Sequence, residues 1–115
     1  AASLVAADGV PVLLVCSDVA SNGPLAEMTG CTLAFGAALV LTLASGARTL
    51  ATLDLKLEPG MPPPASWPDP LAHWRFGSPA AEALDLLVPL ARREPAAITN
   101  AAPGLQLSMG LEYPA

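Results

Sequence analysis

Three side chains carry the chemistry that this sequence could perform, namely His73 and the thiols of Cys16 and Cys31. A hydrolase or transferase needs a nucleophile, a base that activates it and a donor that stabilises developing charge. His73 is the single histidine, and neither a cysteine nor a serine is tied to it by spacing. We interpret it as a histidine that faces solvent or packs on Trp74. The sequence therefore predicts no catalytic residue.

The two cysteines favour a structural interpretation. A nucleophilic cysteine in an α/β protein usually lies where a strand turns into a helix, because the helix N-terminus lowers the pKa of its thiol. Cys16 ends an apolar run, but Ser17, Asp18 and a polar loop follow it without a helical pattern. Two cysteines do not make a disulfide framework. We expect buried free thiols in a cytoplasmic protein, and the residues leave any further role of Cys16 and Cys31 open.

Metal and cofactor sites fail on ligand number and spacing. One histidine and two distant cysteines do not supply the four ligands of a zinc site. The acidic residues are spread along the chain without the spacing of a calcium loop. The glycines match neither the dinucleotide-binding pattern nor the P-loop. We therefore predict no metal site and no cofactor-binding site.

The charge balance excludes several classes of partner. The 115 residues include 5 Lys and Arg against 10 Asp and Glu, for a net charge of -5. The few cations form no basic stripe, which argues against binding to nucleic acid and to acidic lipid surfaces. The longest apolar run, residues 32–44, is shorter than the ~20 residues that a membrane-spanning helix needs. The chain starts without Met, so we expect it to begin inside a longer gene product or after a processing event.

Two apolar runs and one alternating segment predict strands. Val10–Cys16 and Leu33–Leu43 are continuous apolar stretches between turn residues, typical of strands that are buried on both faces in an α/β layer. Leu50–Leu57 alternates, with leucines on one face and Asp54 and Lys56 on the other. This period of two indicates a half-exposed strand.

The second half of the chain predicts a connection, a helix and a hairpin. Residues 58–77 form a proline-rich connection within a single partial domain, residues 1–115. Trp67 and Met61 suggest that this connection packs back on its own domain. A helix is expected to begin with Ser78 as N-cap and to run to residue 91, with Pro89 kinking or ending its last turn. Residues 96–99 and 105–113 are expected to pair as a hairpin.

The order of these elements resembles the β-ketoacyl synthase family. Gly9–Asp18 (GVPVLLVCSD), a loop with residues 24–26 (PLA) and then residues 34–41 (AFGAALVL) resemble the last two core strands of the N-terminal half of such an enzyme. The alternating strand, the proline-rich link, the helix and the hairpin resemble the short bacterial ketosynthase-like proteins of aryl polyene and xanthomonadin-type pathways, often called chain-length factors. The resemblance spans Gly9 to Glu112.

This resemblance implies an α/β, thiolase-like layered fold that is incomplete in this chain. It implies a cytoplasmic heterodimer in which a non-catalytic subunit helps to set acyl or polyene chain length in type II fatty-acid or polyketide-like biosynthesis. The partner is a ketosynthase subunit, or the upstream fragment of the same protein, and it acts on chains held by an acyl carrier protein. The active-site cysteine of true ketosynthases would lie before residue 1, and their two histidines have no match here.

Two alternatives remain open from the sequence. The chain could be a fragment of an active β-ketoacyl-acyl-carrier-protein synthase, an acyltransferase whose nucleophile lies upstream. It could instead be an unrelated α+β interaction domain that folds alone.

Overall fold

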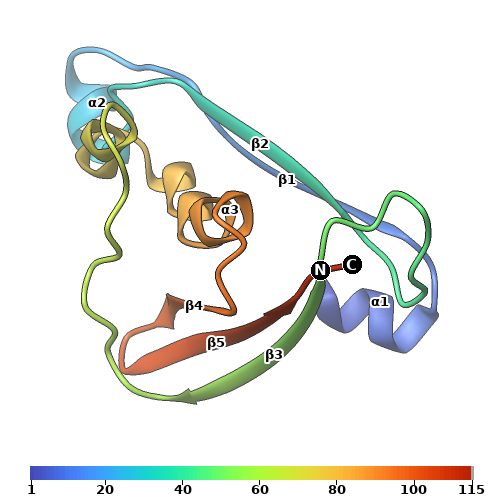
Figure 1. Ribbon diagram of the computed structural model, residues 1–115. Coiled ribbons are helices and arrows are strands. Elements are labelled where there is room, and N and C mark those ends of the chain that lie inside the picture. The colour runs from blue at the N-terminus through green and yellow to red at the C-terminus, as the bar shows by residue number, and fades with distance from the viewer. Residues whose placement is uncertain (115) are drawn as a thin grey trace. The chain divides into compact units, whose positions relative to one another are not determined.

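The computed structural model describes residues 1–114, apart from the side chain of Ala26, as a mixed α/β chain with two antiparallel sheets and several short helices (Figure 1). The chain divides into two compact units. Unit 1 contains Ala1–Ala47 and His73–Ala81, and unit 2 contains Arg48–Ala72 together with residues 82–114. Each unit is built from segments that lie far apart in the sequence.

Unit 1 contains a short helix followed by a two-stranded sheet. Helix α1 (Ala2–Asp8) ends at Gly9, which has the left-handed φ of 66° and donates its N–H to the Val5 carbonyl at 2.9 Å. Glycine suits this helix end, because a residue without a side chain adopts the left-handed conformation at little cost. Strands β1 (Val12–Asp18) and β2 (Phe35–Leu41) then pair side by side over their whole lengths (Figure 1).

The burial expected for β1 and β2 is wrong in one respect. Both strands alternate between half-buried and exposed residues instead of being buried on both faces. The sheet has only these two strands among the residues that the structure describes, so one face of each strand stays open to solvent. We call this two-stranded sheet the β1–β2 ribbon.

The segment between the two strands is more ordered than its sequence predicts. The Ser21 N–H donates to the Cys31 carbonyl at 2.8 Å, which brings the ends of the loop together. Helix α2 (Pro24–Thr29) lies inside this loop. A helix of six residues is too short to show an amphipathic period, and only a proline suited to the first helical position signals it.

Unit 2 is built on a three-stranded antiparallel sheet in the order β3-β5-β4. Its strands are β3 (Thr52–Pro59), β4 (Ala96–Ala102) and β5 (Leu105–Glu112). The predicted hairpin is confirmed as β4 and β5, which pair around a turn that contains Gly104 with a φ of 75°. The alternating strand predicted at residues 50–57 is confirmed as β3, two residues later along the chain at each end.

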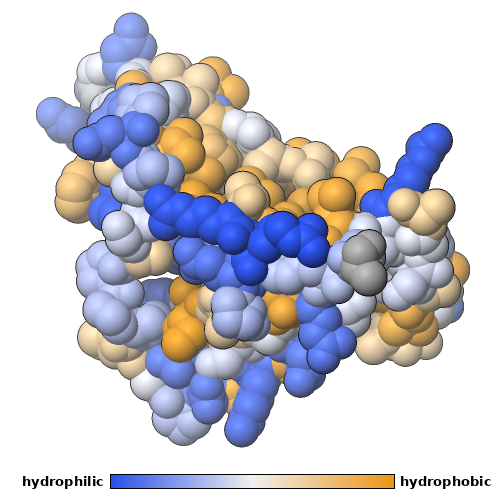
Figure 2. Space-filling model, in the orientation of Figure 1, coloured by the Kyte–Doolittle hydropathy of each residue, from blue (hydrophilic) through white to orange (hydrophobic). Residues whose placement is uncertain are grey.

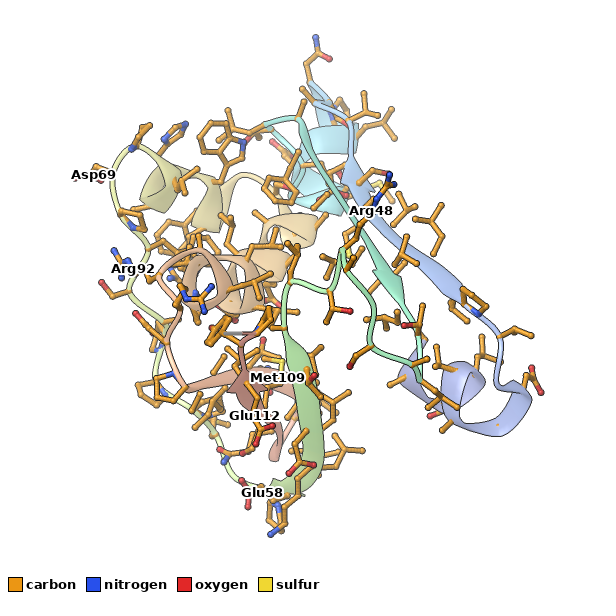
Figure 3. The ribbon with its side chains drawn as sticks, turned by 45° about the vertical axis from the view of Figure 1, so that its right-hand side comes forward. Arg48, Glu58, Asp69, Arg92, Met109 and Glu112 are labelled. Carbon is orange, nitrogen blue, oxygen red and sulfur yellow. The ribbon has the colours of Figure 1, made fainter. Side chains whose placement is uncertain are left out.

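The core of unit 2 lies between this sheet and helix α3 (Leu84–Ala91) (Figure 1). Ala97, Met109 and Leu111 are its buried centre, and Figure 3 labels Met109 on the sheet. Seven partly buried residues pack around this centre, two of them from α3: Ala51, Leu53, Leu55, Leu86, Leu90, Leu107 and Tyr113. Burial of each large aliphatic side chain contributes about 1.5 to 3 kcal/mol, so this cluster stabilises unit 2.

The helix predicted from residue 78 begins differently. Residues Pro79–Ala83 form a 3-10 turn (η2), and α3 follows directly from Leu84. Pro89 lies inside α3, which continues for two more residues. A further 3-10 segment, η1 (Leu71–Phe76), was not predicted, because it is short and follows a proline-rich stretch that masks any period.

The proline-rich connection is held in unit 2 through Trp67. Only 6% of Trp67 is exposed, and its Nε1–H donates to Asp85 Oδ1 at 2.9 Å. The Thr99 hydroxyl donates to the other oxygen of the same carboxylate at 2.7 Å. Asp85 thereby joins the connection, the first turn of α3 and strand β4. The expected packing of this segment is confirmed for Trp67 and is wrong for Met61, which is 79% exposed.

Helix α3 ends in a Schellman motif whose left-handed residue is an arginine. The Glu94 N–H donates to the Pro89 carbonyl at 2.9 Å, and the Arg93 N–H donates to the Leu90 carbonyl at 3.2 Å. Arg93 has a φ of 55°, the one positive value at a residue other than glycine in the described chain. This position normally favours glycine, because a Cβ atom is strained there.

Contacts of the Arg93 side chain offset this strain. Its guanidinium lies 4.7 Å from the centre of the Tyr113 ring and donates to the Pro114 carbonyl at 3.1 Å. The Tyr113 hydroxyl in turn donates to the Glu94 carbonyl at 2.6 Å. A stacked guanidinium contributes about 0.5 to 1 kcal/mol at an exposed site, comparable with the cost of the backbone conformation.

We predict that Arg93→Ala destabilises unit 2, whereas Arg93→Gly is close to neutral. Alanine keeps the backbone strain and loses the stabilising side-chain contacts. Glycine loses the same contacts, but it also relieves the strain. The glycine variant should therefore be about 1 kcal/mol more stable than the alanine variant, measured as the free energy of unfolding in urea. Equal stability of the two variants would show that the left-handed conformation costs nothing here.

Candidate functional site

Polar side chains of unit 1 converge on Asp18, the last residue of β1. The buried Ser78 hydroxyl donates to Asp18 Oδ2 at 2.6 Å, and the Ala80 N–H donates to the same oxygen at 2.6 Å. The Cys31 thiol donates instead to the Thr29 carbonyl at 3.6 Å. We call Asp18, Ser78 and Ala80 the Asp18 cluster. It joins the end of β1 to a segment about 60 residues further along the chain.

Hydrogen bonds from the segment before β2 hold the same region. The N–H groups of Thr32 and Leu33 both donate to the Gly77 carbonyl, at 2.8 and 2.9 Å. A Cβ atom placed at Gly77 would lie 2.6 Å from the Leu33 side chain, so the close approach needs glycine. The Trp74 Nε1–H donates to the Ala34 carbonyl at 2.9 Å. The Asp18 cluster therefore sits in a densely bonded part of unit 1.

The predicted N-cap role of Ser78 is wrong. Its hydroxyl is a donor to Asp18, and the carboxylate of Asp18 accepts the N–H of Ala80 at the start of η2. An ionised carboxylate is a stronger acceptor than a hydroxyl, so it takes the place that a serine cap would fill. Because the two residues are far apart in the sequence, no local pattern could signal this arrangement.

The hydrogen bonds also set the charge state of the cluster. The Ser78 hydroxyl, followed by the Ala80 N–H, holds the pKa of the Asp18 carboxyl below its ordinary value of 3.8. A carboxylate with a lowered pKa is a weak base and does not activate a serine as a nucleophile. The arrangement is suited to holding segments together, and it does not match a nucleophile with its general base.

The structure places the other candidate residues, Cys16, Cys31 and His73, outside the Asp18 cluster. Cys16 and Cys31 are both free thiols, as expected, but both are half-buried, so the full burial expected for them is wrong. Cys16 lies within β1 opposite Ala37, and Cys31 follows α2. His73 is exposed, and its ring centre lies 4.1 Å from that of Trp74. This confirms that His73 faces solvent and packs on the tryptophan.

Within residues 1–114, no group of three or more His, Cys, Asp or Glu side chains is arranged to hold a metal ion. Over the same residues, every helix is too short or too polar to cross a bilayer.

The exposed face of the β1–β2 ribbon is the most unusual surface of unit 1. Leu13, Val15 and Val40 are 63, 58 and 66% exposed. Leu13 pairs with Val40 and Val15 pairs with Ala38, so these side chains are cross-strand neighbours on one face. The two strands contain no charged residue except Asp18, whose carboxylate belongs to the cluster described above. Figure 2 shows hydrophobic surface along the line of these strands in Figure 1.

Comparisons with known proteins identify no relative. No protein-family model, no curated protein and no solved structure matches the chain.

We predict that Ser78→Ala destabilises unit 1, because it removes the hydrogen bond that the buried Ser78 hydroxyl donates to a charged group. The measurement is the free energy of unfolding at neutral pH. The exposed Asp54→Asn is the matched control elsewhere in the chain, and it should leave this free energy unchanged. An unchanged stability of Ser78→Ala would mean that the hydrogen bond contributes nothing.

The lowered pKa of Asp18 also predicts a pH dependence. A depressed pKa in the folded state adds stability that is present above the unfolded value of about 3.8 and is lost as pH falls through the folded pKa. Unfolding temperature should therefore fall below about pH 4. In Asp18→Asn it should start lower at neutral pH and fall less steeply. The variant should keep part of the pH dependence, because the pKa of Glu58 is also lowered, chiefly by the Ser108 hydroxyl. Identical plots of unfolding temperature against pH for the variant and the unchanged chain would contradict the role of Asp18.

Proposed function

We propose that this chain is a non-catalytic, ketosynthase-like subunit that pairs with an active β-ketoacyl synthase and helps to set the length of the acyl or polyene chain. In this proposal the fold is a thiolase-like layered fold that a second polypeptide segment completes. The observation that carries the proposal is the β1–β2 ribbon, whose uncharged, aliphatic face lies open to solvent.

Strand energetics support a missing layer on this ribbon. An isolated two-stranded sheet is marginally stable in water, and continuous apolar strands are typical of sheets that are covered on both faces. Covering Leu13, Val15 and Val40 would contribute about 1.5 to 3 kcal/mol for each fully buried side chain. Further strands or helices on this face would therefore stabilise the ribbon substantially.

The exposed face of the β1–β2 ribbon is too small to form a stable interface by itself, so the proposed partner also contacts other parts of the ribbon. Two strands of seven residues present roughly 240 Å², given a rise of ~3.4 Å per residue and a width of ~10 Å. A standard stable interface buries about 800 Å² on each partner. Face-to-face stacking of two copies would fall well short of this, so the proposed partner also reaches the open edges of the strands.

The Asp18 cluster supports a non-catalytic role. The Ser78 hydroxyl that contacts this carboxylate donates to it, and the lowered pKa of Asp18 makes it a poor base. The proposed partner then supplies the nucleophile and the cationic surface that an acidic carrier protein needs, because this chain has only five Lys and Arg. The contribution of this chain would be shape, through apolar surface next to the growing chain.

We predict that the chain forms a complex with a co-expressed active β-ketoacyl synthase, seen by native mass spectrometry as a mass 11.6 kDa above that of the synthase. Val15→Lys should weaken this complex at least tenfold, because it places a charge in a desolvated apolar contact. Thr52→Lys, on an exposed position of β3 in unit 2, is the matched control and should bind like the unchanged chain.

Hydrogen exchange locates the contact. Amides of Val12–Asp18 and Phe35–Leu41 should become protected in the complex, while the edge of β3 should not change. If the chain stays alone at 11.6 kDa beside the synthase, the proposed function is wrong. If the complex forms and Val15→Lys binds as tightly as Thr52→Lys, the pairing stands and the ribbon is not its contact.

A second function has an observation in its favour, namely the separate core of unit 2. Helix α3 covers one face of a complete three-stranded sheet around Ala97, Met109 and Leu111. Three strands with a hydrophobic face packed on a helix meet the minimum for independent stability. This supports a self-folding α+β interaction domain that needs no ketosynthase.

We predict, for this second function, a cooperative thermal transition of the isolated chain at its monomer mass. Met109→Ala should reduce the free energy of unfolding by about 2 to 5 kcal/mol through the cavity that it leaves. Thr52→Lys should have little effect, since the residue is exposed. A gradual, non-cooperative melt of the isolated chain would rule out this alternative and favour the incomplete fold.

A further inference from the structure

We draw no further inference here: the strongest candidate, the exposed apolar face of the β1–β2 ribbon at Leu13, Val15 and Val40, belongs to the surface on which the proposed function already rests, and nothing in the structure shows what covers it.

Discussion

A carboxylate that accepts hydrogen bonds from two distant donors is the interaction on which each unit depends. In unit 1, Asp18 accepts from Ser78 and Ala80 and holds the returning segment against the end of β1. In unit 2, Asp85 accepts from Trp67 and Thr99 and joins the proline-rich connection to the helix and the sheet. Each carboxylate uses its charge on hydrogen bonds to its own chain. Each carboxylate therefore connects segments of its own unit.

Local patterns in the sequence predict the elements that have a period. The alternation of Leu53 and Leu55 with Asp54 and Lys56 indicates β3, and the alternation after Gly104 indicates β5. These patterns work because alternate side chains of a strand point to opposite faces, and only one face of this sheet meets the helix. The apolar runs of β1 and β2 also predict strands. These runs do not predict how much of each strand is buried, because burial depends on which other segments pack against the strand. The sequence of the strand itself does not specify those segments.

Contacts between distant segments are where prediction from the sequence fails. Ser78 before Pro79 has the local pattern of a helix cap, yet its hydroxyl serves Asp18, about 60 residues away. The six residues of α2 are too few for a helical period. Arg93 occupies a position that normally favours glycine, and only the tyrosine ring beneath it explains the choice. The Asp18 cluster also depends on such a distant contact, because neither the segment around Asp18 nor the segment around Ser78 carries a sequence motif.

The strands of the two units meet water in different ways. Strand β3 carries Asp54, Lys56 and Glu58 at the edge of its sheet, and Glu58, labelled near the end of this strand in Figure 3, accepts hydrogen bonds from Gln106 and Ser108. Charged side chains on an edge strand prevent pairing with other strands. The β1–β2 ribbon has no such charges between Val12 and Ser17 or along β2. The edge of one sheet is thus protected by charge, while the other sheet has the uncharged, apolar composition typical of strands that are covered on both faces.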